Sequence, residues 1–198
     1  MNLHRFPIRL VVQAGAVIVM ALQLNACLPV VAGGAATTGV MASDRRSSGT
    51  FIDDEAIEFK ALKAISDHLG MQEIHANVTS YNRNVLITGE VSSEANKAKA
   101  ETAIKSIDAN IKKITNELKV GPSSTLSART NDTYITSKVK GMFIKKNLFP
   151  ANYVKVVTED SIVYLMGIVT QKEAEDATDI ARHVSDVKQV VKVFDYID

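Results

Sequence analysis

The chain has little of several features that would point to a specialised fold or chemistry. It contains one cysteine in 198 residues, which excludes a disulfide framework within the chain. It has no tryptophan and only 6% aromatic residues, but 46% of its residues are hydrophobic, which is enough to build folded cores. The two signs of charge balance, with 23 Lys+Arg against 22 Asp+Glu, so bulk electrostatics does not favour a nucleic acid as partner.

Signatures of catalysis and of metal binding are also missing. The histidines beyond the N-terminal region are His68, His75 and His183, and none lies in an HExxH or other metal-ligand spacing. The chain has no G-x-S-x-G motif, no P-loop and no glycine-rich dinucleotide motif. We therefore expect no enzymatic activity, no cofactor and no metal.

The single cysteine, Cys27, follows a segment typical of an export signal. Basic residues within positions 4–9 precede an apolar run from Leu10 to Leu22, which is short for a transmembrane helix and has the length of a signal-peptide core. Residues 24–27, LNAC, resemble a bacterial lipobox, which implies a signal peptide over 1–26 and a lipid on Cys27. The alternative is a cysteine that only ends an ordinary secretory signal or a membrane anchor.

Lipidation would decide where the protein resides. Each buried methylene contributes about 0.8 kcal/mol, so the three acyl chains of a lipoprotein hold it permanently at a membrane. Leu28 follows the cysteine in place of an aspartate, which under the lipoprotein sorting rule favours the outer membrane. Residues 27–51 are rich in Gly, Ala, Ser and Thr, which predicts a flexible tether. We expect a protein anchored in the outer membrane and facing the periplasm.

After the tether the chain contains a unit of about seventy residues, used twice. Aligning residues 84–120 with 162–197 brings Gly89 onto Gly167, and aligning 53–65 with 131–143 brings Ile57 onto Ile135. The predicted domains are 52–120 and 131–198, joined by a polar linker at 121–130. Gly89 and Gly167 fall inside strands, where glycine indicates a bulge or a close approach by a packed helix, with a ligand contact as the alternative.

Each unit has the pattern of an α-β-β-α-β fold. Apolar residues at helical spacing follow Asp53–Asp54 and Asn131–Asp132, which we expect to cap the first helices. YNRN (81–84) and EDS (159–161) have the composition of hairpin turns, and Ser92–Ser93 and Thr170 precede the second helices. The expected strands lie at about 73–80, 84–91 and 112–120 in the first unit, and at 152–158, 161–169 and 188–197 in the second. The fold class is α+β, as two tandem two-layer sandwiches with both helices on one sheet face.

The repeat resembles the BON domain. The resemblance rests on V-x-I-x-G-x-V at 85–91 and V-x-L-x-G-x-V at 163–169, each followed by a capped helix. Together with the lipobox, it makes the chain similar to dual-BON outer-membrane lipoproteins of Gram-negative bacteria. This resemblance implies a role in envelope integrity, with the division site as a location in some members, and attachment to phospholipid without a catalytic centre.

The two predicted sheets differ on the face away from the helices. In the first unit the last strand alternates, with Thr115, Glu117 and Lys119 on the outer side, which predicts a solvated face. The second unit carries apolar residues there, which are too many to leave in water. They are Ile162, Tyr164, Met166, Ile168, Val191 and Val193. We expect either the first domain or an envelope protein partner to cover them.

The first helix of the second unit is basic. Residues 131–149 hold four lysines against one aspartate, a net charge of +3, whereas 53–67 hold five acidic residues against two lysines, a net charge of −3. A basic amphipathic helix favours an anionic membrane surface. The predicted lipid-binding residues are Lys138, Lys140, Phe143, Lys145, Lys146, Leu148 and Phe149. We expect Leu148 and Phe149 to be exposed if this interpretation is right.

Two functions follow from these patterns. The first is a lipid-anchored phospholipid-binding protein that supports outer-membrane integrity, with the second domain contacting anionic phospholipid. The second is a protein-interaction adaptor for an envelope or division-site partner that docks on the apolar sheet face, in which case the basic helix is an ordinary solvated face.

Overall fold

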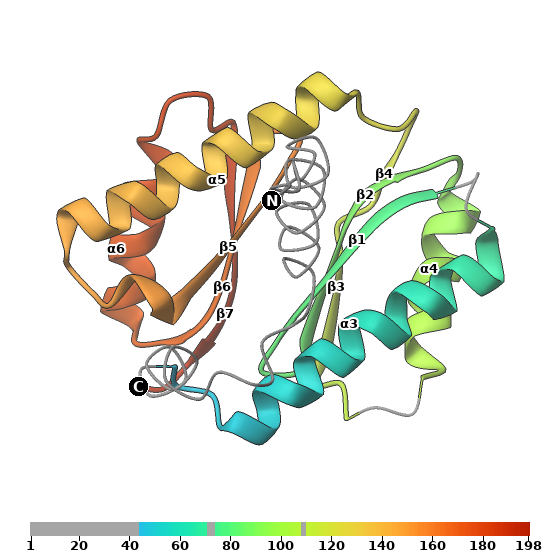
Figure 1. Ribbon diagram of the computed structural model, residues 1–198, viewed down its shortest axis with the longest axis horizontal. Coiled ribbons are helices and arrows are strands. Elements are labelled where there is room, and N and C mark those ends of the chain that lie inside the picture. The colour runs from blue at the N-terminus through green and yellow to red at the C-terminus, as the bar shows by residue number, and fades with distance from the viewer. Residues whose placement is uncertain (1–43, 71–73, 108–109) are drawn as a thin grey trace, which may run out of the picture. The chain divides into compact units, whose positions relative to one another are not determined.

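The computed structural model describes residues 44–70, 74–107 and 110–198 (Figure 1). The predicted signal peptide, Cys27 and the first part of the tether lie outside these described residues. Within them, no helix combines the length and the apolar character needed to cross a membrane.

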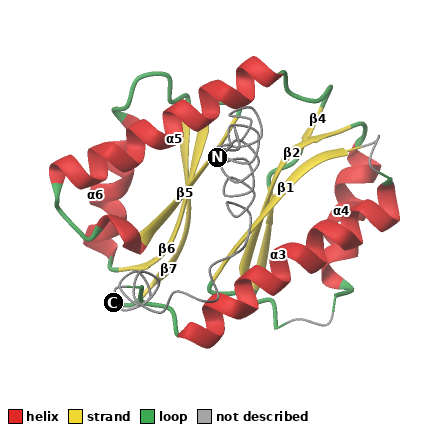
Figure 2. Ribbon diagram, viewed as in Figure 1, coloured by secondary structure: helices red, strands yellow, loops and turns green. Residues whose placement is uncertain are grey.

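The first domain has the predicted α-β-β-α-β order (Figure 2). Strand β2 is the central strand: it pairs antiparallel with β1 and parallel with β3 and β4. The predicted last strand is interrupted at Glu117–Leu118 and so becomes two short strands. The elements are α3 (Ser48–Leu69), β1 (Ile74–Tyr81), β2 (Asn84–Val91), α4 (Glu94–Lys105), β3 (Lys113–Asn116) and β4 (Lys119–Val120).

The second domain repeats this order with a continuous last strand. Strand β6 pairs antiparallel with β5 and parallel with β7 over eight residues. The elements are α5 (Leu126–Lys146), the short 3-10 helix η2 (Ala151–Tyr153), β5 (Val154–Glu159), β6 (Ile162–Val169), α6 (Gln171–Arg182) and β7 (Gln189–Tyr196). The predicted α+β class is confirmed.

In each domain both helices cover one face of the sheet, and the core lies between these layers (Figure 1). Ile57, Ala61 and Ile65 recur at helical spacing on α3 and are at most 3% exposed, because this spacing puts them on one side of the helix. They pack with Val85 and Ile87 of β2. In the second domain the corresponding core contains Ile135, Val139 and Phe143 of α5 together with Val163 and Leu165 of β6.

The first helices begin earlier than the sequence predicts. Ser47 caps α3 and Thr125 caps α5, each by accepting a hydrogen bond from a backbone N–H three residues on. Residues 44–51 therefore belong to the folded part and not to the tether, and half of the predicted linker is helix. Asp54 and Asp132 are not caps: they lie within their helices and are buried.

The two buried aspartates instead bind the hairpin turns of their own domains. Asp54 accepts hydrogen bonds from the backbone N–H groups of Asn82 (2.8 Å) and Arg83 (2.7 Å). Asp132 accepts the equivalent pair from Asp160 and Ser161, at 3.0 and 2.8 Å. All four turn residues have positive φ, the conformation of a two-residue type I′ hairpin. Each aspartate thus ties its helix to its hairpin.

The second helices follow the prediction more closely. Thr170 caps α6, and Glu173 returns a hydrogen bond to the backbone N–H of Thr170, which completes a capping box. Ser93 caps α4 by accepting from the N–H of Asn96 at 3.2 Å.

The mid-strand glycines sit where another part of the backbone comes close. A Cβ on Gly89, which has φ 115°, would lie 1.9 Å from the carbonyl oxygen of His75. A Cβ on Gly167 would lie 2.4 Å from the carbonyl oxygen of Tyr153. The close approach comes from the neighbouring strand β1 in one case and from η2 in the other, and not from a packed helix.

Candidate functional site

Two of the predicted lipid-binding residues lie in the core. Phe143 is 0% and Phe149 is 4% exposed, and their rings meet edge to face with centroids 5.1 Å apart. The helix ends at Asn147, whose left-handed conformation (φ 50°) turns the chain, and Phe149 packs back against Phe143. The expectation that Phe149 is exposed is therefore wrong, and Phe143 does not reach the surface.

The other predicted residues lie on the surface of α5 or just after it. Lys140, Lys145 and Lys146 are exposed, and Leu148 is 58% exposed. Ile144, which is not among the predicted lipid-binding residues, is 69% exposed. Its position was readable from the sequence: nine residues at about 100° each place Ile144 opposite Ile135 on the helix, and Ile135 is a core residue.

Lys138 is partly engaged within its own domain. Its ammonium donates to the Ser185 hydroxyl, forms an ion pair with Asp186 at 3.3 Å and lies 4.9 Å from the centroid of the Tyr134 ring. For Lys140, Lys145 and Lys146, no ion pair is formed with any residue that the structure describes. These three lysines and the apolar Ile144 and Leu148 are all exposed on α5 or just after it, and we call this set of side chains the α5 surface.

The charge of the α5 surface is not offset by acids on the same segment. From Thr133 to Phe149 the sequence has four lysines and no acidic residue, and Asp132 is buried against its hairpin turn. Helix α3, at the equivalent place in the first domain, holds five acidic residues and two lysines. The two helices thus keep the opposite charges that the sequence predicts.

The apolar sheet face of the second domain is covered by the first domain. Tyr164, Met166 and Val193 are at most 6% exposed and form one hydrophobic cluster with Tyr81 and Leu86 of the first domain. The other four members are partly buried around it: Val157, Ile162, Ile168 and Val191. Of the two covers that the sequence left open, the structure has the first domain, and this face is not free for a partner.

The outer face of the first sheet is correspondingly not solvated, so that expectation is wrong. Leu86, Thr88 and Glu90 on β2 are at most 8% exposed. The alternation of the last strand misled the prediction: Thr115 and Glu117 are partly buried, and Lys119, although exposed, forms an ion pair with Asp160 of the second domain. Burial raises the pKa of Tyr164 in this interface, and the nearby carboxylates Glu117, Glu159 and Asp160 raise it further.

Polar contacts surround the apolar cluster between the domains. The side-chain amides of Asn82 and Asn84 both donate to Asp195, at 2.6 and 2.7 Å. Lys119 forms an ion pair with Asp160 at 2.5 Å. Hydrogen bonds from Lys119 and from Lys188 lower the pKa of Asp160. These contacts orient one domain on the other at the edge of the cluster.

The segment before α3 also joins the two domains, which the sequence reasoning missed. Arg45 forms a two-pronged ion pair with Glu173, at 2.7 and 2.8 Å, and its guanidinium lies 3.9 Å from the centroid of the Tyr153 ring. Arg46 binds Asp54 at 2.8 Å within the first domain. The signal was the charged DRR at 44–46 in an otherwise Gly/Ser/Ala-rich stretch.

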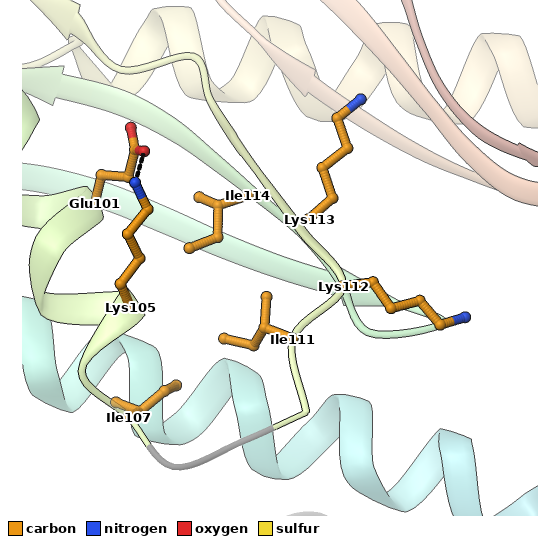
Figure 3. A pocket seen from close by; sticks show the side chains of 7 residues that line it. All are labelled: Glu101, Lys105, Ile107, Ile111, Lys112, Lys113 and Ile114. Atoms are coloured by element: carbon orange, nitrogen blue, oxygen red, sulfur yellow. Dashed lines mark hydrogen bonds and ion pairs between the residues drawn. The ribbon is translucent and has the colours of Figure 1, made fainter.

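A pocket of about 370 Å³ in the first domain is lined by residues of α4, of the segment before β3 and of β3 itself (Figure 3). Ile107, Ile111 and Ile114 line it, and Lys105 forms an ion pair with Glu101 at 2.6 Å. None of its described lining residues is a histidine, a cysteine or a serine.

Comparison with known proteins places the repeat in a family. A model described as "BON domain" matches residues 53–122 and 131–198. Outer membrane lipoprotein DolP of Haemophilus influenzae is 37% identical over 176 residues, which cover 88% of this chain and 91% of that protein. The 21 kDa hemolysin of Actinobacillus pleuropneumoniae is 30% identical over 78% of this chain and 79% of its own length. Osmotically-inducible protein Y of Escherichia coli is 30% identical over 75% of each.

Proposed function

This chain belongs to the BON-domain family and carries two BON domains, and from that premise we propose that it is a lipid-anchored outer-membrane protein whose second BON domain binds anionic phospholipid through the α5 surface. Its similarity to an outer membrane lipoprotein along most of both chains supports the anchor and the location. The names of its relatives are not those of enzymes, which agrees with a binding role in the envelope.

The observation that carries the proposal is the composition of the α5 surface. Lys140, Lys145 and Lys146 are exposed together with Ile144 and Leu148. Exposed lysine side chains attract an anionic lipid surface, and exposed aliphatic side chains gain free energy when they enter the boundary between headgroups and acyl chains. Both kinds of side chain are present on α5 and just after its C-terminal end.

The expected strength of binding follows from these side chains. Each lysine near an anionic surface contributes about 1 kcal/mol. Full burial of a Leu or Ile side chain contributes roughly 1.5–3 kcal/mol, and Ile144 and Leu148 have more than half of their surface still to bury. Together the five side chains supply roughly 5 kcal/mol, which suits a contact that adds to a lipid anchor and does not replace it.

The test uses the unlipidated fragment from Asp44 to Asp198, which contains both hydrophobic cores. The fragment is mixed with vesicles that contain or lack phosphatidylglycerol, and amide NMR shifts and vesicle co-sedimentation are measured. We expect binding that needs the anionic lipid, weakens with salt and shifts amides of residues 138–149. Lys145→Glu with Lys146→Glu should weaken binding about tenfold or more.

The apolar part of the contact has a matched control in the first domain. Ile144→Ser with Leu148→Ser should weaken vesicle binding about tenfold or more, because it removes the aliphatic contribution. Phe59→Ser removes a side chain that is 72% exposed on the acidic helix α3, and should leave binding unchanged. Equal losses in the two variants, or no binding to any vesicle, would refute the α5 surface as the lipid contact.

A further inference from the structure

A histidine and two glutamates from both domains meet beside the interdomain cluster. His75 on β1 and Glu90 on β2 are paired across the first hairpin, with His75 Nδ1 and Glu90 Oε2 3.0 Å apart. Glu159 at the end of β5 comes from the second domain. One ligand atom from each of the three side chains lies within 4.8 Å of the others.

The two carboxylates are buried without a full cationic partner. Glu90 is 8% and Glu159 is 7% exposed. In residues 44–70, 74–107 and 110–198, no lysine or arginine forms an ion pair with either of them. Burial raises the pKa of Glu159, and the charge of Glu90 raises it further, although the Asn77 hydrogen bond acts in the opposite direction. Two buried carboxylates this close need a bound proton or a cation between them.

Neighbouring donors hold the carboxylates in place. The Asn77 side-chain amide donates to Glu159 Oε2 at 2.9 Å, and the Thr88 hydroxyl donates to the same oxygen at 3.3 Å. The backbone N–H of Ser124 donates to Glu90 Oε2 at 3.0 Å. Such hydrogen bonds to ligating carboxylates are the usual outer support of a metal site.

The separations suit a small cation. With bonds of 2.0–2.2 Å, the ligand atoms of a tetrahedral zinc site lie roughly 3.4 Å from one another, and the three groups need to move by about an ångström or less to reach this spacing. A cavity of about 600 Å³ lined in part by His75, Asn77 and Glu159 gives solvent access, so water can supply a fourth ligand. One imidazole, two carboxylates and a water are a donor set that binds Zn²⁺ and similar ions.

We infer that His75, Glu90 and Glu159 form a binding site for a divalent transition-metal cation, with Zn²⁺ as the representative ion, which links the two BON domains. No sequence pattern indicates this site, because its ligands lie 15 and 69 residues apart along the chain and come from different repeats. The site is separate from the α5 surface and does not depend on lipid binding.

The inference is tested by titrating the full chain, purified in detergent and stripped with a chelator, with Zn²⁺ in a calorimeter. We expect one Zn²⁺ to bind per chain, and we expect this binding to require the cluster. We also expect the thermal unfolding midpoint to rise when Zn²⁺ is added. His75→Ala and Glu159→Gln should each weaken this binding more than about 100-fold, since loss of a ligand costs at least as much as loss of an outer-shell partner. Glu159→Gln is nearly isosteric and should keep the fold.

A second histidine beside an acid provides the control. His183 is exposed and its Nδ1 lies 3.8 Å from an oxygen of Asp179, so His183→Ala should leave the affinity and the rise in unfolding temperature unchanged. Absence of Zn²⁺ binding by the stripped chain would overturn the inference and leave a proton as the occupant of the cluster. Binding that survives both His75→Ala and Glu159→Gln would overturn it as well, because the ion would then sit elsewhere.

Discussion

The aspartate that ties each first helix to its hairpin is expected to be the most sensitive polar residue of its domain. Asp54 is 1% exposed. It accepts hydrogen bonds from the Ser80 hydroxyl at 2.7 Å and from two turn N–H groups at 2.8 and 2.7 Å, and it also binds Arg46 at 2.8 Å. Asp54→Ala removes the acceptor for all four groups at once.

The magnitude follows from the groups left without a partner. A buried donor that loses its acceptor costs about 1–3 kcal/mol. The turn residues are only partly buried, so water replaces part of the loss, and Arg46 keeps Asp44 at 2.7 Å. We expect Asp54→Ala to lower the free energy of unfolding by about 3–4 kcal/mol, and to lower the unfolding temperature by roughly 6–16 °C.

The second domain should respond less to the equivalent change. Among the residues that the structure describes, two turn groups donate to Asp132, the N–H groups of Asp160 and Ser161, and Asp160 is exposed. For Asp132→Ala we expect a loss of about 2 kcal/mol, because fewer groups are left without a partner and water reaches one of them.

The assay is urea unfolding of the fragment from Asp44 to Asp198, followed by circular dichroism. The control is Asp53→Ala: Asp53 is adjacent to Asp54 but exposed, and it makes a surface ion pair with Arg83 at 2.7 Å, worth at most about 1 kcal/mol. If Asp53→Ala and Asp54→Ala cost the same, or if Asp54→Ala costs less than about 1 kcal/mol, the aspartate does not brace the turn and the reasoning fails.

Three further predictions concern stability. In the same urea assay, Gly89→Ala should cost about 3 kcal/mol because its Cβ would lie 1.9 Å from a carbonyl oxygen of the adjacent strand. Gly141→Ala should instead stabilise helix α5 by up to about 1 kcal/mol, because a Cβ at Gly141 has nothing within 4 Å. Phe143→Ala should cost about 3–5 kcal/mol and Ile144→Ala less than about 0.5 kcal/mol, and similar unfolding midpoints for the two would contradict their assignment to core and surface. Burial raises the pKa of Glu159. The contribution of Glu159 to the free energy of unfolding is therefore favourable at acid pH, and it is lost as pH rises through the raised pKa. Metal-free Glu159→Gln should therefore be more stable than the native chain at pH 7 and equal to it below about pH 4, and a difference that does not change with pH would refute this account.

The elements that were predicted correctly depend on contacts close in the sequence. The hairpin between β5 and β6 follows from a two-residue turn that tolerates positive φ, and the capping box of Thr170 and Glu173 follows from groups three residues apart. The V-x-[IL]-x-G-x-V strands were found because alternation and a glycine recur in both repeats. Local geometry decides these features, so a single sequence contains enough to predict them.

The errors share a different cause. An aspartate before an apolar run has the pattern of a helix cap, but Asp54 binds a turn about 28 residues away, to Asn82. Phe149 follows a basic helix and a turn, and only the direction of the chain after Asn147 puts its ring on Phe143. The carboxylate of Asp54 accepts hydrogen bonds, and the ring of Phe149 packs, against residues that no local sequence pattern identifies.

The candidate site divides in the same way. The four lysines, and their contrast with the acidic helix α3, are visible in the sequence, because net charge needs no knowledge of contacts. Helical spacing also places Ile144 on the surface, but the burial of Phe149 was settled by packing, since its ring meets Phe143 only because the chain turns at Asn147.

The sequence by itself determined the two BON repeats, their strand order and the charge of each first helix, because periodicity, turn chemistry and composition act over a few residues. Only the tertiary structure decided that the first domain covers Tyr164 and Met166, and that His75 and Glu90 meet Glu159. These arrangements depend on how two separately folded sheets face each other, and burial of side chains from both domains sets that arrangement through contacts between residues far apart along the chain.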